Sequence, residues 1–255
     1  MEFIDTHTHI SDEAFAGEEE DVIRRAHDAG VSVMIQPDVD SKEREAMFNL
    51  VDRHPGELYA MLGLYPGSVD AGWREEFDRM LEYRLRKVVA IGEIGLDYHY
   101  GAEWAKEQKE VLRLQLELAS EMNLPVNIHL REATEDFLAI VRECSHLGIR
   151  GNLHAYSGSY ETFMQLQRYG DWRVGIGGVV TFKKAALAET VKKIPLERIV
   201  LETDAPYLTP VPYRGTRNES MHIPVIAEFI AALKGIGIEE VAEVTTEGAR
   251  QLFGI

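Results

Sequence analysis

The feature that most constrains the fold is a regular alternation of short apolar segments with longer amphipathic segments along the chain. The apolar segments are rich in β-branched residues and bounded by glycine or proline, which is typical of strands buried in a parallel sheet. Such segments occur at residues 2–5, 31–36, 58–64, 88–94, 125–130, 150–155, 172–180 and 198–203. Eight strands, each followed by a helix, predict a (β/α)8 barrel, the α/β fold also called a TIM barrel.

The segments between these strands carry helical patterns. One of them, E-E-D-V-I-R-R-A-H-D-A-G, ends at Gly30, a residue type that commonly stops helices. The longest covers residues 103–123, carries a run of valine and leucine residues, and ends before Pro125. Neither a linker nor a low-complexity segment interrupts the pattern, so we expect one domain over residues 1–255.

An open, doubly wound sheet is the competing α/β layout, and it would usually carry a cofactor fingerprint. The glycine cluster G-I-G-G-V-V at residues 175–180 is not one, because it falls late in a predicted strand, without the strand–glycine–helix spacing. We interpret the cluster as a tight strand end where the backbone approaches another group closely. A phosphate cradle is the alternative, since barrels do bind phosphates near strands seven and eight.

Histidine and carboxylate residues lie where a barrel places its active site. The stretch D-T-H-T-H at residues 5–9 holds two histidines two residues apart, which share one face of an extended strand. Because the carboxyl ends of barrel strands converge on one mouth, residues at these ends should meet. The candidate metal ligands at these ends are His7, His9, Glu93, His129, His154 and Asp204.

Imidazole and carboxylate ligands suit a divalent ion, and six ligands are too many for one catalytic ion. We therefore expect two divalent ions, Zn, Mg or Mn, lying about 4 Å apart. The expected partition places His7, His9 and Asp204 on one ion, His129 and His154 on the other, and Glu93 between them. Asp5 and Glu202 each precede a candidate ligand by two residues and share its face of the strand. We expect them to orient these ligands.

The net charge of −16, from 27 Lys and Arg against 43 Asp and Glu, argues against broad adhesion to nucleic acid or anionic lipid. A polyanionic substrate would have to meet local positive charge, from two divalent ions and from nearby basic side chains. Arg131 follows His129 by two residues, so both lie on the same face of the strand and Arg131 should point into the mouth of the barrel. Further basic residues could hold phosphate oxygens or could equally be solvated charges on the surface. They are Lys183, Lys184, Arg214 and Arg217.

The chain carries no predicted targeting or membrane segment. The N-terminus lacks the basic and apolar regions of a signal peptide, and no segment approaches the roughly 20 apolar residues that span a bilayer. The single Cys144 excludes an intrachain disulfide, which fits a reducing compartment. We expect a cytoplasmic monomer without a membrane partner.

With these residues identified, the chain resembles the TatD family of metal-dependent hydrolases, within the wider amidohydrolase-like barrels, almost from end to end. The resemblance rests on D-T-H-T-H at 5–9, A-I-G-E-I-G-L-D-Y-H at 90–99, P-V-N-I-H-L-R at 125–131, H-A-Y-S-G at 154–158, G-I-G-G-V-V-T-F-K at 175–183, and E-T-D-A-P-Y-L-T-P with R-G-T-R-N-E at 202–219. It implies a TIM-like barrel, a divalent-metal site formed by the six candidate ligands, and nuclease activity on DNA, often from the 3′ end. Some relatives are linked to removing mischarged amino acids from tRNA.

The sequence departs from the family pattern in three places. The usual G-L-H-P after strand three is G-L-Y-P here, so Tyr65 stands where the family has a histidine near the substrate. Ala155 and Tyr156 replace a Cys-Phe pair, and Gly248 replaces an asparagine in the C-terminal pattern. None of these changes affects a predicted metal ligand.

We predict hydrolysis of phosphodiester bonds by a metal-activated hydroxide, with single-stranded DNA or DNA 3′ ends as substrate. Asp204 would accept the proton of the attacking water, Glu93 would bridge the ions, and Arg131 would hold charge that develops on the phosphate. The same site could instead hydrolyse a carboxylic ester or amide, such as aminoacyl-tRNA, and RNA is a further candidate substrate. A metal-binding protein without catalytic activity is the other alternative, which the large ligand set disfavours.

Overall fold

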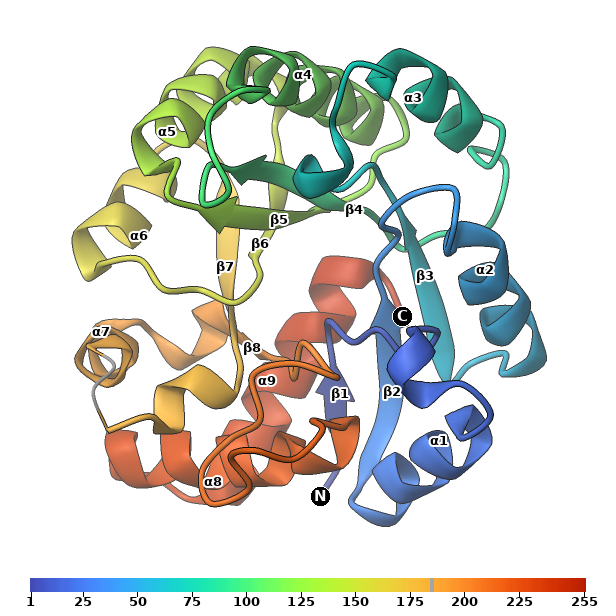
Figure 1. Cartoon of the computed structure of the whole chain (residues 1–255). Helices are drawn as coiled ribbons and strands as arrows, with labels where there is room; N and C mark the ends of the chain where they lie inside the picture. The colour runs from blue at the N-terminus through green and yellow to red at the C-terminus, as the bar shows by residue number, and fades with distance from the viewer. Residues whose placement is uncertain (184–185) are drawn as a thin grey trace.

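The computed structural model describes residues 1–183 and 186–255 and confirms the predicted TIM barrel (Figure 1). In this part of the chain, eight parallel strands pair in chain order from first to last. They are β1 (Phe3–Asp5), β2 (Val31–Gln36), β3 (Leu58–Leu62), β4 (Ala90–Asp97), β5 (Val126–Arg131), β6 (Arg150–Leu153), β7 (Asp171–Ile176) and β8 (Ile199–Leu201). The ring closes where the Thr6 amide donates to the Leu201 carbonyl and where Thr8 forms a parallel bridge with Ala205.

Helices pack against the strands, most of them around the outside of the barrel and the last across one of its ends (Figure 1). They are α1 (Glu19–Asp28), α2 (Arg44–Arg53), α3 (Trp73–Leu81), α4 (Ala105–Glu121), α5 (Thr134–Glu143), α6 (Tyr160–Leu166), α7 (Leu187–Lys193), α8 (Ile223–Lys234) and α9 (Ile238–Phe253). Short 3-10 helices in the connections are η1 (Glu13–Phe15), η2 (Pro66–Ser68), η3 (Cys144–Leu147), η4 (Gly178–Thr181), η5 (Leu196–Arg198) and η6 (Ser220–His222). No single described helix is long and apolar enough to cross a bilayer; only η6–α8 and α9 taken together reach that length and composition, as a pair bent by 113°.

Helix α1 illustrates why these segments are helical. Acidic residues fill its first turn, where their charge is stabilised by the positive end of the helix dipole. Its Ile23 and Ala26 are buried on the face that packs against the barrel. The helix stops before Gly30, whose φ of +88° is a left-handed conformation that glycine adopts without steric cost, and β2 begins at the next residue.

The amino-terminal end of the barrel is closed by α9. Its side chains Ala249, Leu252 and Phe253 form a buried cluster with residues from the strands. The strand residues of this cluster include Ile4 of β1, Ile35 of β2, Met61 of β3 and Val200 of β8. Because this apolar plug fills one end, the polar side chains gather at the opposite, carboxyl end of the strands.

Two strands, β4 and β7, end three or more residues away from their predicted ends. Residues 172–180 were expected to form one strand, but β7 ends at Ile176 and η4 begins at Gly178. A Cβ on Gly178 would lie 2.1 Å from the Leu208 carbonyl oxygen, so the chain turns here against the segment that follows β8. Strand β4 is longer than predicted and continues to Asp97, which places Glu93 inside the strand rather than at its end.

Candidate metal centre

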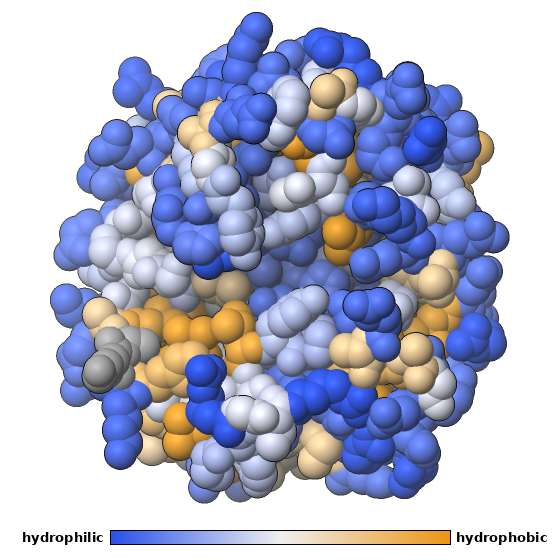
Figure 2. Space-filling view, in the orientation of Figure 1, coloured by the Kyte–Doolittle hydropathy of each residue, from blue (hydrophilic) through white to orange (hydrophobic). Residues whose placement is uncertain are grey.

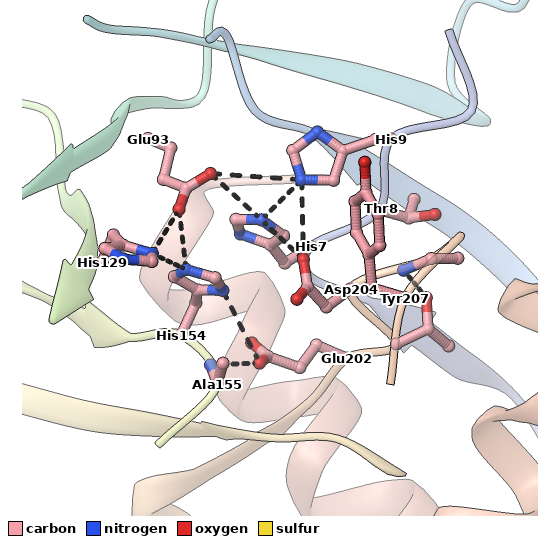
Figure 3. Close-up of polar contacts among 12 residues, drawn as sticks. His7, Thr8, His9, Glu93, His129, His154, Ala155, Glu202, Asp204 and Tyr207 are labelled. Carbon is pink, nitrogen blue, oxygen red and sulfur yellow. Dashed lines mark hydrogen bonds and ion pairs between the residues drawn. The ribbon is translucent and has the colours of Figure 1, made fainter. Parts of the chain in front are cut away.

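The six candidate ligands meet at the carboxyl end of the barrel. Glu93 lies between two pairs of histidines (Figure 3). Its Oε1 is 2.9 Å from Nδ1 of His129 and 2.8 Å from Nε2 of His154. Its Oε2 is 3.6 Å from Nε2 of His7, while Oδ1 of Asp204 is 3.5 Å from Nε2 of His9. Side chains that follow or belong to five different strands therefore surround one small volume.

Two groups of three ligand atoms are compact enough to hold a metal ion, with their atoms within 4.8 Å of one another. The first group is His7, His9 and Asp204, the same three residues that were expected on one ion. The second is His7, Glu93 and His154, so His7 and not His129 completes it. His129 approaches this second group from the other side, with Nδ1 3.1 Å from Nε2 of His154.

His7 is oriented by two buried amides. Its Nδ1 lies 2.9 Å from Oδ1 of Asn127, and the Asn127 amide nitrogen donates to Oδ1 of Asn152. The Asn127 oxygen must therefore accept a hydrogen from Nδ1, which leaves the lone pair of His7 on Nε2. Burial, reinforced by the electrostatic effect of the neighbouring His154, lowers the pKa of His7 to about 3, so its ring stays neutral. The free lone pair then faces Nε2 of His9 at 3.2 Å.

The donor chemistry of this cluster fits a divalent cation. Burial opposes the ionisation of Glu93, but His154 and His129 hold the pKa of that carboxyl well below its usual range. Burial also opposes the ionisation of Asp204, but the hydrogen bond from His9 and the electrostatic effect of the neighbouring histidines together outweigh it and lower the pKa of Asp204. Ionised carboxylate oxygens and a neutral imidazole nitrogen thus face one another, and a divalent ion among them would satisfy their lone pairs.

Asp97 orients His129, and the sequence reasoning missed it. Oδ2 of Asp97 lies 2.8 Å from Nε2 of His129, and the Tyr65 hydroxyl donates to the same oxygen at 3.4 Å. A carboxylate on the far ring nitrogen is a common way to fix the tautomer of a metal-ligating histidine. The Tyr65 ring also stands edge-on to His129, with centroids 5.0 Å apart. The alternation of side chains along a strand could have suggested Asp97, since it follows Glu93 by four residues in the same strand and so shares its face.

Asp5 and Glu202 hold the strand ends that carry the candidate ligands. Asp5 accepts hydrogen bonds from the His7 amide at 3.2 Å and from the Thr203 amide and hydroxyl at 3.0 and 2.5 Å. It therefore joins the ends of β1 and β8, and burial raises the pKa of Asp5 to about 6. Glu202 acts at β6 rather than on Asp204, because it accepts the Ala155 amide, with Oε1 4.0 Å from Nδ1 of His154.

The glycine cluster at residues 175–180 admits neighbouring protein groups. A Cβ on Gly175 would lie 1.8 Å from Oε2 of Glu202, so only glycine leaves room for this buried carboxyl group. Gly178 allows the close approach of the Leu208 carbonyl described above. Both approaches are made by protein groups, as the strand-end interpretation predicts.

Asn218 positions the segment that carries Asp204. The Asp204 backbone is left-handed, with φ of +56°. Asn218 is fully buried, and its amide donates to the Thr203 carbonyl at 2.8 Å and to the Tyr207 carbonyl at 2.6 Å, on either side of Asp204. Its Oδ1 accepts the Glu219 amide at 3.0 Å. The R-G-T-R-N-E block therefore contributes to the site through this amide, which the sequence reasoning did not single out.

The candidate ligands open onto a cavity of about 640 Å³. Arg131 lines this cavity, as its face of the strand predicts, and is the one lysine or arginine to do so among residues 1–183 and 186–255. Its guanidinium lies 5.6 Å from the centre of the Tyr100 ring, which also lines the cavity. In the described part of the chain Arg131 forms no ion pair, so its charge is available to a substrate.

The other basic candidates are placed differently. Arg217 donates to Glu18 at 2.9 Å and to Glu219 at 3.0 Å, so its charge is already paired. Arg214 lies over the Phe182 ring, 4.0 Å from its centre, and Lys183 is exposed outside the cavity lining. Lys184 lies outside the described residues.

Comparison with known proteins agrees with this arrangement. A sequence model of the family described as "TatD related DNase" matches residues 4–254. The chain is 38% identical to "Uncharacterized metal-dependent hydrolase YabD" of Bacillus subtilis over 98% of both chains. It is 34% identical to "Putative deoxyribonuclease TATDN3" of Mus musculus, over 98% of this chain and 87% of the mouse protein. The crystal structure of YjjV, a TatD homologue from Escherichia coli, superposes with a TM-score of 0.90 at 29% identity, covering 99% of this chain and 98% of YjjV. The chain therefore belongs to the TatD related DNase family.

Proposed function

We propose that this protein is a two-metal phosphodiesterase that removes nucleotides from DNA, with single-stranded 3′ ends as its preferred substrate. The enzyme is a metal-dependent hydrolase that acts on ester bonds, as its family relatives indicate. The observation that carries the proposal is a cavity lined by five of the six candidate ligands, with the sixth, His7, buried against them, and by one arginine without an ion pair in the described part of the chain. A phosphodiester offers anionic oxygens to the metal ions that these ligands would hold and to the guanidinium of the arginine.

The candidate ligands would hold two divalent ions, His7, His9 and Asp204 one of them, and Glu93 and His154 the other. Such ions lower the pKa of a bound water and offset the charge that develops on a phosphate. His129 would complete the second group, in the orientation that Asp97 imposes.

Asp204 and Arg131 supply the remaining chemistry. Oδ1 of Asp204 faces His7 and His9, while its Oδ2 has no hydrogen-bond partner in the described part of the chain. Because the pKa of Asp204 is lowered, this oxygen is unprotonated and can accept the proton of an attacking water. The Arg131 guanidinium, which lines the same cavity from the end of β5, can bind a phosphate oxygen that does not react.

The proposal is tested by incubating the protein with end-labelled single-stranded DNA, in Mn²⁺ or in a chelator. We expect shortening from the 3′ end that the chelator abolishes. The variant Asp204→Asn should lose about 10²–10⁴-fold in kcat while still binding DNA, because the general base is removed and the shape is kept.

Asp78→Asn is the matched control, since it makes the same change at an exposed position of α3, outside the cavity lining and the candidate ligand set. It should retain activity near that of the native protein. An aminoacyl-tRNA tested in parallel separates phosphodiester from carboxylic ester hydrolysis. Full activity of Asp204→Asn would remove this residue as the base, and deacylation of the tRNA without cleavage of DNA would refute the phosphodiesterase proposal.

A further inference from the structure

One side of the cavity has no part in the proposed chemistry. Val179 of η4 and Leu208, in the segment after β8, both line the cavity with half-buried side chains. Hydrophobic surface gathers on this side of the central hollow, toward α7 (Figure 2). We call the pair Val179 and Leu208 the apolar wall.

Two backbone features build the apolar wall. Leu208 has a φ of +57°, a left-handed conformation that residues with a branched side chain rarely adopt. Gly178, directly before Val179, lets the Leu208 segment lie on η4, because a Cβ there would meet the Leu208 carbonyl oxygen at 2.1 Å and the Pro210 nitrogen at 2.8 Å. Unfavourable backbone conformations of this kind persist where the surrounding structure enforces them, and they cluster at ligand sites.

Charge is unevenly distributed around the same cavity. Arg131 is on one side, and the acidic Asp12 and Glu43 lie toward His9. The apolar wall carries neither a charge nor a hydrogen-bonding side chain. A substrate whose phosphate lies at the metal centre would therefore direct the charged phosphate oxygens toward Arg131 and an uncharged part of the molecule toward the apolar wall.

We propose that the apolar wall is the binding site for the nucleobase next to the scissile phosphate. The inference rests on the proposed phosphodiesterase function and names the part of the substrate that this cavity recognises. The faces of a nucleobase are flat and weakly polar, so aliphatic side chains can pack against them, as aromatic platforms do in proteins that bind single strands without sequence preference. A wall without hydrogen-bonding groups cannot distinguish the base edges, so the enzyme requires a base but accepts all four.

Tyr207 bounds this base site on the side of the metal centre. Its side chain is 55% exposed, and its ring stands edge-on to His9 with centroids 6.4 Å apart. Its hydroxyl donates to Asp12 at 3.2 Å, which restrains the ring beside His9 in the lining of the same cavity.

A double-mutant cycle between enzyme and substrate tests the proposal. The substrates are a single-stranded oligothymidylate and the same strand with abasic residues at both ends, with Mn²⁺ present. The enzymes are the native protein and Leu208→Gly, which removes the side chain but tolerates the left-handed backbone. Val211→Ala is the matched control, because Val211 is an exposed aliphatic residue of the same segment outside the cavity lining.

We expect the native enzyme to have a kcat/KM about tenfold lower on the abasic strand, as for other losses of apolar contact in a binding pocket. Leu208→Gly should lose the same factor on oligothymidylate and nothing further on the abasic strand, while Val211→Ala behaves as the native enzyme. Equal cleavage of both strands by the native enzyme would overturn the base site alone, and so would an equal loss on both strands in Leu208→Gly. A native enzyme that cleaves neither strand refutes the proposed function together with the base site.

Discussion

Replacing Gly175 by alanine tests how the interior of the barrel supports the candidate metal centre. The new Cβ would lie 1.8 Å from Oε2 and 2.5 Å from Cδ of Glu202, far inside contact distance, so the buried carboxyl group must move. Its Oε1 accepts the Ala155 amide beside His154, and that hydrogen bond would be lost.

The expected cost has two parts. Forcing a methyl group into a packed interior costs about 1–3 kcal/mol. Leaving a buried hydrogen-bonding group without its partner costs about 1–3 kcal/mol more, so Gly175→Ala should lower the free energy of unfolding by about 2–6 kcal/mol. Since native proteins are stable by about 5–15 kcal/mol, a loss in the lower part of this range leaves a folded variant whose unfolding can be measured.

The assay is urea unfolding of the metal-free protein, followed by tryptophan fluorescence, because Trp172 is fully buried in the same strand. Gly177→Ala is the matched control. A Cβ on Gly177 meets nothing closer than the Glu202 carbonyl oxygen at 3.4 Å, which is an ordinary contact. The control should therefore equal the native protein or gain about 0.4–1 kcal/mol from the less flexible unfolded chain.

Glu202→Ala provides the second half of the test. In this background the methyl group at position 175 meets no carboxyl group, so most of the cost of Gly175→Ala should disappear. Equal losses of stability at positions 175 and 177, or an undiminished loss in the Glu202→Ala background, would show that the close approach of Glu202 is not what requires glycine.

Three further predictions concern the site and its surroundings. Asp97→Asn should weaken Mn²⁺ binding at pH 9 by about 10–100-fold in calorimetry, because His129 loses the carboxylate that orients it; unchanged affinity would refute this role. In the metal-free protein, burial opposes protonation of His129, but hydrogen bonds with Asp97 and Glu93 and the charges of these two carboxylates together raise its pKa to about 9. Since this pKa exceeds that of the unfolded chain, the stabilisation by His129 is complete below about pH 6.5 and is lost as the pH rises to 9. Urea unfolding of the native protein and of His129→Gln in chelator should show a difference that shrinks across this window, and a constant difference would contradict the assignment. Arg217→Ala should leave KM for DNA unchanged and lower the free energy of unfolding by about 1–2 kcal/mol, because its partners Glu18 and Glu219 are intramolecular; a large rise in KM would instead place Arg217 on the substrate.

Sequence periodicity was sufficient for the architecture. Continuous apolar segments are recognisable as buried parallel strands without knowing which strand pairs with which. Their alternation with helices then restricts the chain to a few possible topologies. It was also sufficient to bring the six candidate ligands together, because the carboxyl ends of barrel strands always share one mouth. The end of α1 before Gly30 was also recognisable, because a glycine after a helical pattern is a local signal.

The sequence singled out Asp5 and Glu202 as orienting residues, but it did not show which ligand a residue of this kind contacts. Asp97 reaches His129 because β4 and β5 pair with Gly95 opposite His129, after an irregularity in register between Ile91 and Ile94. A shift in register changes which side chains are neighbours, and no residue in the sequence marks it. Asn218 likewise acts on Asp204 through a segment that folds back from well beyond β8.

The sequence by itself determined which side chains could bind metal and that a barrel would gather them, since both follow from residue type and local period. Only the tertiary structure decided that Arg131 is free while Arg217 is paired, and that Gly175 makes room for Glu202. The physical reason is that these outcomes depend on distances of a few ångströms between segments far apart in the chain, which local preferences do not specify.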